Sequence, residues 1–138
     1  MATVRLWCAL MAAFLLAGCS SDESLTAVRS QISHFREQMA SQQFHQIYAE
    51  ASDDLKKSST EQQMVDLLAA INRKLGAVAD AKENGWKVDF RTTGSMVTLS
   101  LKTQFERGSG IETFVYRISG KDALLMGYHV NSNDLILN

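Results

Sequence analysis

The residue with the clearest chemistry is a cysteine placed directly after an apolar segment near the N-terminus. Leu16-Ala17-Gly18-Cys19 follows a short positive start at Met1–Arg5 and an apolar run at Leu6–Leu16. A cationic start, an apolar run too short to span a bilayer and small residues before a cleavage site indicate an export signal. A cysteine at the end indicates a bacterial lipobox, whose thiol receives a diacylglyceryl group. A plain signal peptide, or a membrane anchor with a chance cysteine, is the alternative.

This pattern predicts where the chain resides. We expect residues 1–18 to be a signal peptide, Cys19 to carry the lipid, and the polar residues up to Ser24 to form a flexible tether within 19–24. Because one acyl chain holds a protein only marginally, the several chains of a processed lipoprotein should hold it stably. An aspartate directly after the lipidated cysteine favours retention in the inner membrane, but this chain has Ser20 there. We therefore expect lipid anchoring in the outer membrane of a bacterial cell envelope, facing the periplasm.

A second candidate for chemistry is a carboxylate among aromatic residues. Glu112, Phe114 and Tyr116 alternate along one expected strand and so share a face, and Tyr128 lies on the next strand. A carboxylate in an apolar interior can serve as a general base when burial raises its pKa. We therefore expect Glu112, Phe114, Tyr116 and Tyr128 to line a pocket if one exists. No set of catalytic residues can be assigned from the sequence.

The remaining polar candidates have plainer interpretations. Asp89, Arg91, Glu112 and Arg117 lie on strands, where cross-strand ion pairs on a solvated face are the more common arrangement. His34, His45 and His129 are far apart and form no helical pair, so we expect surface or core-edge histidines and no metal site.

Two further residue types favour the core over a binding site. Trp86 should cover a core edge, with a partner anchor as the alternative. Core positions are also favoured over an adaptable groove for Met39, Met64, Met96 and Met126. Gly108-Ser109-Gly110 has no helix after it and is expected to be a turn, not a phosphate loop.

The elements that must position these residues begin with helices. Apolar residues at three- and four-residue steps predict a helix over about 23–41, and a short one follows from Phe44 to Ala51. Ser52-Asp53-Asp54 is expected to be a turn or cap. A third helix should begin near 58–60, with Ser59 and Gln62 at capping-box spacing, and end at Gly76. Its expected buried face consists of Met64, Leu67, Leu68, Ile71 and Leu75.

After Gly85 the apolar period changes from helical to alternating. The alternation predicts a first strand from Trp86 to Phe90, a turn at Thr93-Gly94 and a long second strand ending at Phe105. Ile111–Ser119 and Leu124–Val130 should follow as strands, with Gly127 as a bulge. Helices followed by sequential hairpins predict an α+β domain over 25–138, with N-terminal helices packed on a bent four-stranded antiparallel sheet.

Composition excludes several classes of protein. Arg5 is the only charged residue of the expected signal, so the mature chain keeps 13 of the 14 basic residues and all 15 acidic ones, a net charge of −2. Such a balance gives no reason to expect nucleic-acid binding. Of the two cysteines only Cys19 is outside the signal, which excludes an intramolecular disulfide and a cysteine metal site in the mature chain.

Core and turn residues carry a resemblance to a known family. The segments that carry it are Phe44-His45-Gln46-Ile47-Tyr48, Ala51-Ser52, Leu75-Gly76, Glu112-Thr113-Phe114 and Leu125-Met126-Gly127-Tyr128-His129-Val130. Their layout along the chain resembles small bacterial lipoproteins with a nuclear transport factor 2-like, cystatin-like domain. The resemblance implies a cone of helices and bent sheet. It implies little about function, because that superfamily includes isomerases, dehydratases, transport factors and plain binding domains.

These observations favour a membrane-tethered, non-enzymatic binding or interaction module without a cofactor. Its partner would be a small apolar ligand or an envelope protein, and no nucleic acid is expected. One alternative is a small isomerase- or hydrolase-type enzyme with an inward carboxylate. The other is a structural homodimer whose sheets pack face to face, which requires an exposed apolar patch on the sheet.

Overall fold

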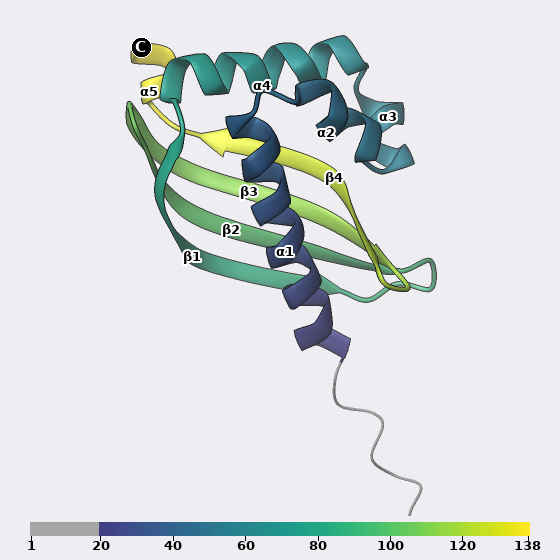
Figure 1. Cartoon of the computed structure of the whole chain (residues 1–138). Helices are drawn as coiled ribbons and strands as arrows, with labels where there is room; N and C mark the ends of the chain where they lie inside the picture. Colours follow the sequence, from purple (N-terminus) through teal and green to yellow (C-terminus); the bar gives the residue numbers. More distant parts are fainter. Residues whose placement is uncertain (1–19) are drawn as a thin grey trace, which may run out of the picture.

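A computed structural model describes residues 20–138, and Figure 1 shows their arrangement. The predicted signal peptide and the predicted lipidation site, Cys19, lie outside the described residues. The elements are α1 (Ser20–Ala40), α2 (Phe44–Glu50), α3 (Asp53–Ser58), α4 (Glu61–Leu75), β1 (Val78–Asp89), β2 (Ser95–Phe105), β3 (Gly108–Ser119), β4 (Asp122–Asn131) and α5 (Asp134–Leu137). Helices followed by an antiparallel sheet confirm the predicted α+β class.

Helix α1 forms because its apolar residues recur at helical spacing on one face. Leu25, Val28, Ile32 and Phe35 are buried against the sheet, whereas the opposite face is exposed. The helix begins at Ser20, so the segment up to Ser24 is helical and does not form the flexible tether expected. Asp22 and Glu23 in the first turn favour helix here, since negative charge stabilises a helix N-terminus.

Helix α4 begins and ends close to the predicted positions. Its N-cap is Thr60, one residue after the expected Ser59, and Thr60 and Gln63 form the reciprocal bonds of a capping box. Gly76 follows with a positive φ of 77°, and a Cβ there would lie 2.5 Å from a Glu106 carboxylate oxygen. Leu67, predicted to be buried, is 45% exposed because it flanks the apolar stripe.

Residues 53–58 form the short helix α3, where the sequence predicted only a turn or cap at Ser52-Asp53-Asp54. Ser52 is its N-cap and accepts a hydrogen bond from the Leu55 backbone N–H at 3.2 Å. Leu55 is buried and fixes the helix to the core. The sequence pattern missed α3 because a six-residue helix offers a single buried apolar position, too few to show a period.

The four strands form one antiparallel sheet in the order β1-β2-β3-β4, as the sequential hairpins predicted. Three strands begin earlier than expected: β1 begins at Val78, β4 begins at Asp122, and Gly108-Ser109-Gly110 belongs to β3 instead of forming a turn. The β3–β4 register shifts next to Val115, which faces Gly127, so the predicted bulge lies at this place. The β1–β2 register shifts twice, between Val78 and Asp80 and between Glu83 and Gly85.

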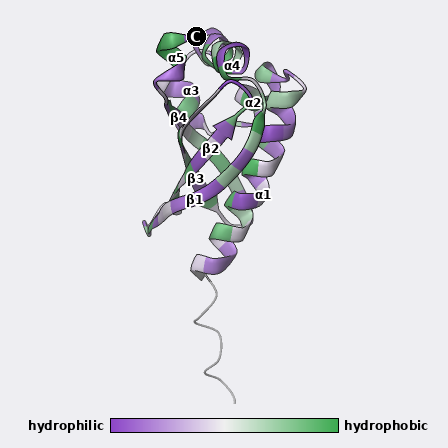
Figure 2. Cartoon of the chain, turned by 90° about the vertical axis from the view of Figure 1, so that its left-hand side faces the viewer, coloured by the Kyte–Doolittle hydropathy of each residue, from purple (hydrophilic) through white to green (hydrophobic). Residues whose placement is uncertain are grey.

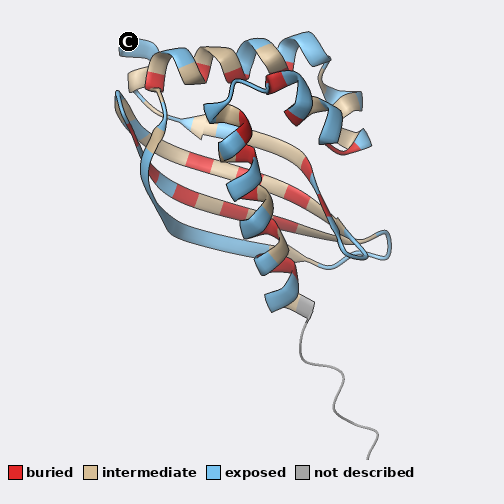
Figure 3. Cartoon of the chain, in the orientation of Figure 1, coloured by how far each residue is buried: buried red, intermediate tan, exposed pale blue. Residues whose placement is uncertain are grey.

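The core lies between one face of the sheet and the helices. Figure 2 shows α1 on one side of the sheet and α4 across its end. Buried residues form bands on β2, β3, β4 and α1, whereas β1 is exposed along most of its length (Figure 3). Along residues 20–138, none of the helices has the length and apolar character needed to cross a bilayer.

Candidate functional site

A buried carboxylate lies at the centre of the domain. Glu112 on β3 is 2% exposed, and three donors surround it. Its Oε1 accepts a hydrogen bond from the Tyr128 hydroxyl at 2.7 Å, and its Oε2 accepts from Arg36 Nη2 at 2.8 Å and Thr103 Oγ1 at 2.5 Å. We call Arg36, Thr103, Glu112 and Tyr128 the buried polar cluster. A buried charge requires such partners, because desolvation without them is strongly unfavourable.

Three different elements supply the donors: α1 supplies Arg36, β2 supplies Thr103 and β4 supplies Tyr128. Thr103 on β2 and Glu112 on β3 both point inward because each belongs to the inward alternation of its strand. Arg36 extends from α1, where it follows the buried Phe35, and its side chain is 22% exposed. The cluster therefore joins the helix layer to the sheet through one carboxylate.

One donor of the cluster has no partner. Arg36 Nη1 is buried and makes no hydrogen bond within residues 20–138. A guanidinium presents five N–H donors and no acceptor, so this nitrogen can only be satisfied by an acceptor oxygen or nitrogen. An unsatisfied buried donor costs about 1–3 kcal/mol, which makes this side of Arg36 receptive to an acceptor group.

Aromatic rings enclose the cluster on the side of the sheet. The Tyr128 ring centroid lies 4.8 Å from that of Phe35 and 4.9 Å from that of Phe114, and Phe114 stacks on Tyr116 at 6.5 Å. Burial, and then the neighbouring Glu112 charge, raise the pKa of the Tyr128 hydroxyl well above its ordinary value. Burial also raises the pKa of Tyr116. Both hydroxyls are therefore protonated at neutral pH.

A cavity of about 180 Å³ lies beside the cluster, and we call it the inner cavity. Arg36, Glu112 and Tyr128 contribute polar groups to its wall, and Ala40 and Ala77 are exposed residues at its rim. Most of the lining is apolar: Phe35, Met39, Ala40, Ile71, Ala77, Val78 and Phe105. A cavity of about 150 Å³ with apolar walls holds a molecule the size of benzene. The inner cavity thus accommodates a small molecule or the end of a chain.

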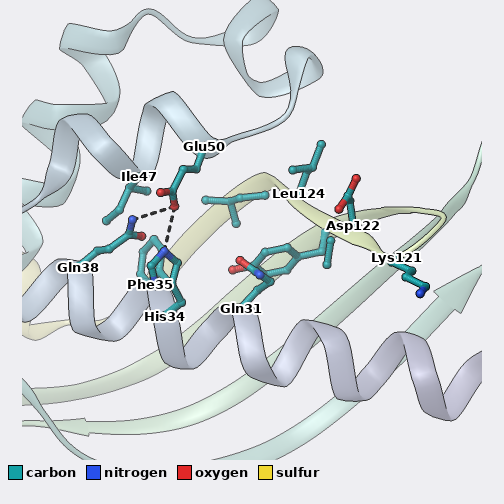
Figure 4. A pocket seen from close by; sticks show the side chains of 12 residues that line it. Gln31, His34, Phe35, Gln38, Ile47, Glu50, Lys121, Asp122 and Leu124 are labelled. Atoms are coloured by element: carbon teal, nitrogen blue, oxygen red, sulfur yellow. Dashed lines mark hydrogen bonds and ion pairs between the residues drawn. The ribbon is translucent and has the colours of Figure 1, made fainter.

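A second pocket, of about 490 Å³, opens between α1, α2 and the β3–β4 hairpin. Figure 4 shows His34 and Gln38 of α1 converging on Glu50 of α2, with Lys121 and Asp122 at the opposite end. Glu50 accepts from His34 at 3.0 Å, Gln38 at 2.9 Å and Gln46 at 2.7 Å. Hydrogen bonds, first from Gln46, lower the pKa of Glu50. These bonds connect α1 to α2.

The candidate pocket residues meet as the strand alternation indicated. Glu112, Phe114 and Tyr116 are buried on one face of β3, Tyr128 bonds to Glu112, and His129 is exposed on the other face of β4. The inner cavity, however, is lined by Glu112 and Tyr128 without Phe114 or Tyr116. Sequence reasoning missed Arg36 and Thr103. Arg36 could have been suspected from the sequence, because it directly follows Phe35, a residue of the apolar face of the predicted helix.

The other weighed residues lie elsewhere. Trp86 is 54% exposed, so it does not cover a core edge as favoured. Met64 is buried and Met39 packs against the core, whereas Met96 and Met126 are partly exposed. Arg117 pairs with Asp54 of α3 at 2.8 Å, and Asp89 with Lys87 at 2.9 Å. His34 and His45 contact Glu50 and Glu61, and the described residues contain no group that could hold a metal ion.

Comparison with known proteins leaves this arrangement to be interpreted on its own geometry. No family model matches the chain, and no curated protein matches its sequence.

Proposed function

We propose that the mature chain is a lipid-anchored envelope protein whose α+β domain is a non-enzymatic binding module. Its ligand would be a small, mostly apolar molecule that carries an acceptor oxygen and occupies the inner cavity. The anchoring part rests on the sequence: a cationic start, a short apolar run and Leu16-Ala17-Gly18-Cys19. Sorting to the outer membrane rests on Ser20 alone.

The observation that carries the binding part is that Arg36, whose Nη1 has no hydrogen-bond partner within residues 20–138, is one of the few polar residues lining the mostly apolar inner cavity. Apolar walls with a few placed polar groups are the usual composition of a small-molecule site. A carbonyl, hydroxyl or ether oxygen would accept from the Arg36 guanidinium, while the rest of the molecule would cover Met39, Ile71 and Phe105. Glu112 would hold the guanidinium in position from the other side.

An enzyme of the isomerase or hydrolase class is the second candidate. It is supported by an inward carboxylate with a tyrosine donor 2.7 Å away, both lining the inner cavity. The three donors on Glu112 argue against it, since a general base needs a lone pair free for the substrate proton. A carboxylate has about four lone-pair sites, of which the three donors leave at most one.

Lipid attachment is tested by metabolic labelling of the full chain with a tagged fatty acid. Cys19→Ser should lose the label and release the protein from membranes. Cys8→Ser is the matched control, because Cys8 lies in the expected signal and should leave labelling unchanged. Labelling that survives Cys19→Ser would contradict the anchor. Ser20→Asp should move the protein from the outer to the inner membrane fraction.

Ligand binding is tested by native mass spectrometry of the Cys19→Ser protein, exported and purified gently. A retained mass of a small organic molecule is expected. Ala77→Phe should exclude it by filling the rim, whereas Ala79→Phe, outside the lining, should not. A clean mass in the wild type would favour an envelope protein as partner, or a homodimer, which crosslinking in native membranes would detect. A bound molecule that differs in mass between the wild type and Glu112→Gln would favour the enzyme.

A further inference from the structure

We infer that the exposed aromatic edge formed by Trp86 and Phe90 lies in the headgroup region of the anchoring membrane and orients the domain on it. This inference rests on the proposed lipid anchor at Cys19. It goes beyond that anchor, because a lipid chain alone fixes a protein to the membrane but does not determine which face meets the surface.

The first observation is where the anchor joins the fold. Helix α1 begins at Ser20, the residue next to Cys19. Ser20–Ser24 therefore lies within a helix, and a helical turn cannot extend or fold as a loose tether does. The N-terminal end of α1 must then lie close to the lipid headgroups, together with whatever part of the domain is beside it.

The second observation is what lies beside that end. Glu23, Ser24 and Ala27 of α1 line one surface hollow together with Gly94 and Gly120, the turn glycines of the β1–β2 and β3–β4 hairpins. Figure 1 shows both hairpin ends and strand β1 toward the N-terminal end of α1, with α4 at the opposite end of the domain. The β1–β2 hairpin therefore lies on the side of the anchor.

The third observation is the aromatic surface on this hairpin. The register pairs Trp86 with Leu99 and Val88 with Val97, so Trp86 and Val88 point to the helix-covered face. Val88 reaches the core, but Trp86 is 54% exposed and Phe90, the residue that follows β1, is 64% exposed. Trp is enriched at membrane–water interfaces, where its ring meets the acyl chains and its N–H the headgroups.

The charged residues near Trp86 and Phe90 indicate whether electrostatic attraction or aromatic insertion would hold this surface on the membrane. Basic and acidic residues in the first turn of α1 and near the two hairpin turns almost cancel: Lys87, Arg91 and Lys121 against Asp22, Glu23, Asp89 and Asp122. Attraction to anionic lipid would require a basic excess. Aromatic insertion does not, so the contact should form on zwitterionic lipid and persist at high salt. A shared tether also raises the local concentration of the surface for a second, weak contact.

Trp86 itself is the reporter for the test, because Trp7 lies in the expected signal and Trp86 is the only other tryptophan. The full lipidated protein is reconstituted in phosphatidylcholine vesicles, with or without lipids brominated near the headgroup. Trp86 emission should fall to about half with brominated lipid, since an interfacial ring lies within reach of the bromine. The same loss should be measured at low and high salt.

Two variants supply the controls. Trp86→Phe with Phe90→Trp should also be quenched, whereas Trp86→Phe with Leu67→Trp should not, because Leu67 is exposed on α4 at the far end. Vesicle flotation distinguishes the two proposals. Protein that does not float would overturn the anchor, and the inference with it. Protein that floats but has unquenched Trp86 would overturn the inference alone, and a blue-shifted, unquenched emission would indicate that a second copy of the chain covers Trp86 instead.

Discussion

Replacement of Tyr128 by Phe tests whether the buried polar cluster stabilises the fold. The substitution keeps the ring, and with it the contacts to Phe35 and Phe114 at 4.8 and 4.9 Å, and removes only the hydroxyl. Glu112 Oε1 then loses the donor at 2.7 Å, inside a residue that is 2% exposed. A hydrogen bond to a charged group contributes about 1.5–3 kcal/mol. We expect a loss of about 2 kcal/mol.

The assay is urea unfolding of the exported Cys19→Ser protein, followed by circular dichroism and Trp86 emission. Tyr48→Phe is the matched control, because the Tyr48 hydroxyl donates to the neutral Ser59 carbonyl at 3.0 Å near the surface. That change should cost less than about 1 kcal/mol. For a domain of this size, a loss of about 2 kcal/mol relative to the wild type corresponds to a melting temperature lower by roughly 5–10 °C in Tyr128→Phe.

A double-mutant cycle shows whether the loss belongs to the Tyr128–Glu112 pair. In Glu112→Gln the charge is gone, so removal of the Tyr128 hydroxyl should destabilise the domain by at least about 1 kcal/mol less than in the wild type. A Tyr128→Phe protein as stable as Tyr48→Phe, or strictly additive losses in the double variant, would refute the assignment of Glu112 as the charged centre of the cluster.

Three further predictions follow from the same contacts. Because the pKa values of Tyr116 and Tyr128 are raised in the folded state, the unfolded chain loses these protons at a lower pH than the folded one, so the free energy of unfolding should be fully present below about pH 10 and fall above it. Each Tyr→Phe variant should reduce this fall with pH when urea unfolding is measured at several pH values. A stability that does not change up to pH 11 would contradict the raised pKa values. Gly94→Ala should lower the free energy of unfolding by about 2 kcal/mol or more, because φ is +111° and the new Cβ would lie 2.5 Å from the Ile118 carbonyl oxygen. In the control Gly85→Ala the new Cβ meets open space, so the free energy of unfolding should change by less than about 1 kcal/mol. In a carboxyl NMR titration, Glu50 should titrate below its ordinary pKa, and Gln46→Ala should raise that midpoint more than Gln38→Ala; equal effects would contradict the leading role of Gln46.

The sequence predicted those parts of the fold in which neighbours along the chain decide the structure. Alternation fixed the inward face of β3, so Glu112 and Tyr116 are buried together as expected. It could not predict Arg36, because an ion pair across 76 residues depends on where α1 crosses the sheet. Nor could it predict that Trp86 is exposed. An apolar alternation shows which face a strand presents, but not whether a helix covers that face at the edge of the sheet.

The two proposals together predict where a ligand would come from. The anchor is expected at the N-terminal end of α1, whereas Met39 and Ala40 at the rim of the inner cavity lie at its C-terminal end. A helix of 21 residues is about 30 Å long, so an upright domain would hold the rim roughly that far from the anchor, in the aqueous phase. Adding the ligand to water outside preformed proteoliposomes should then load the cavity fully. Loading that occurs only when the ligand is dissolved in the lipid would mean that the domain lies on its side, with the rim against the bilayer.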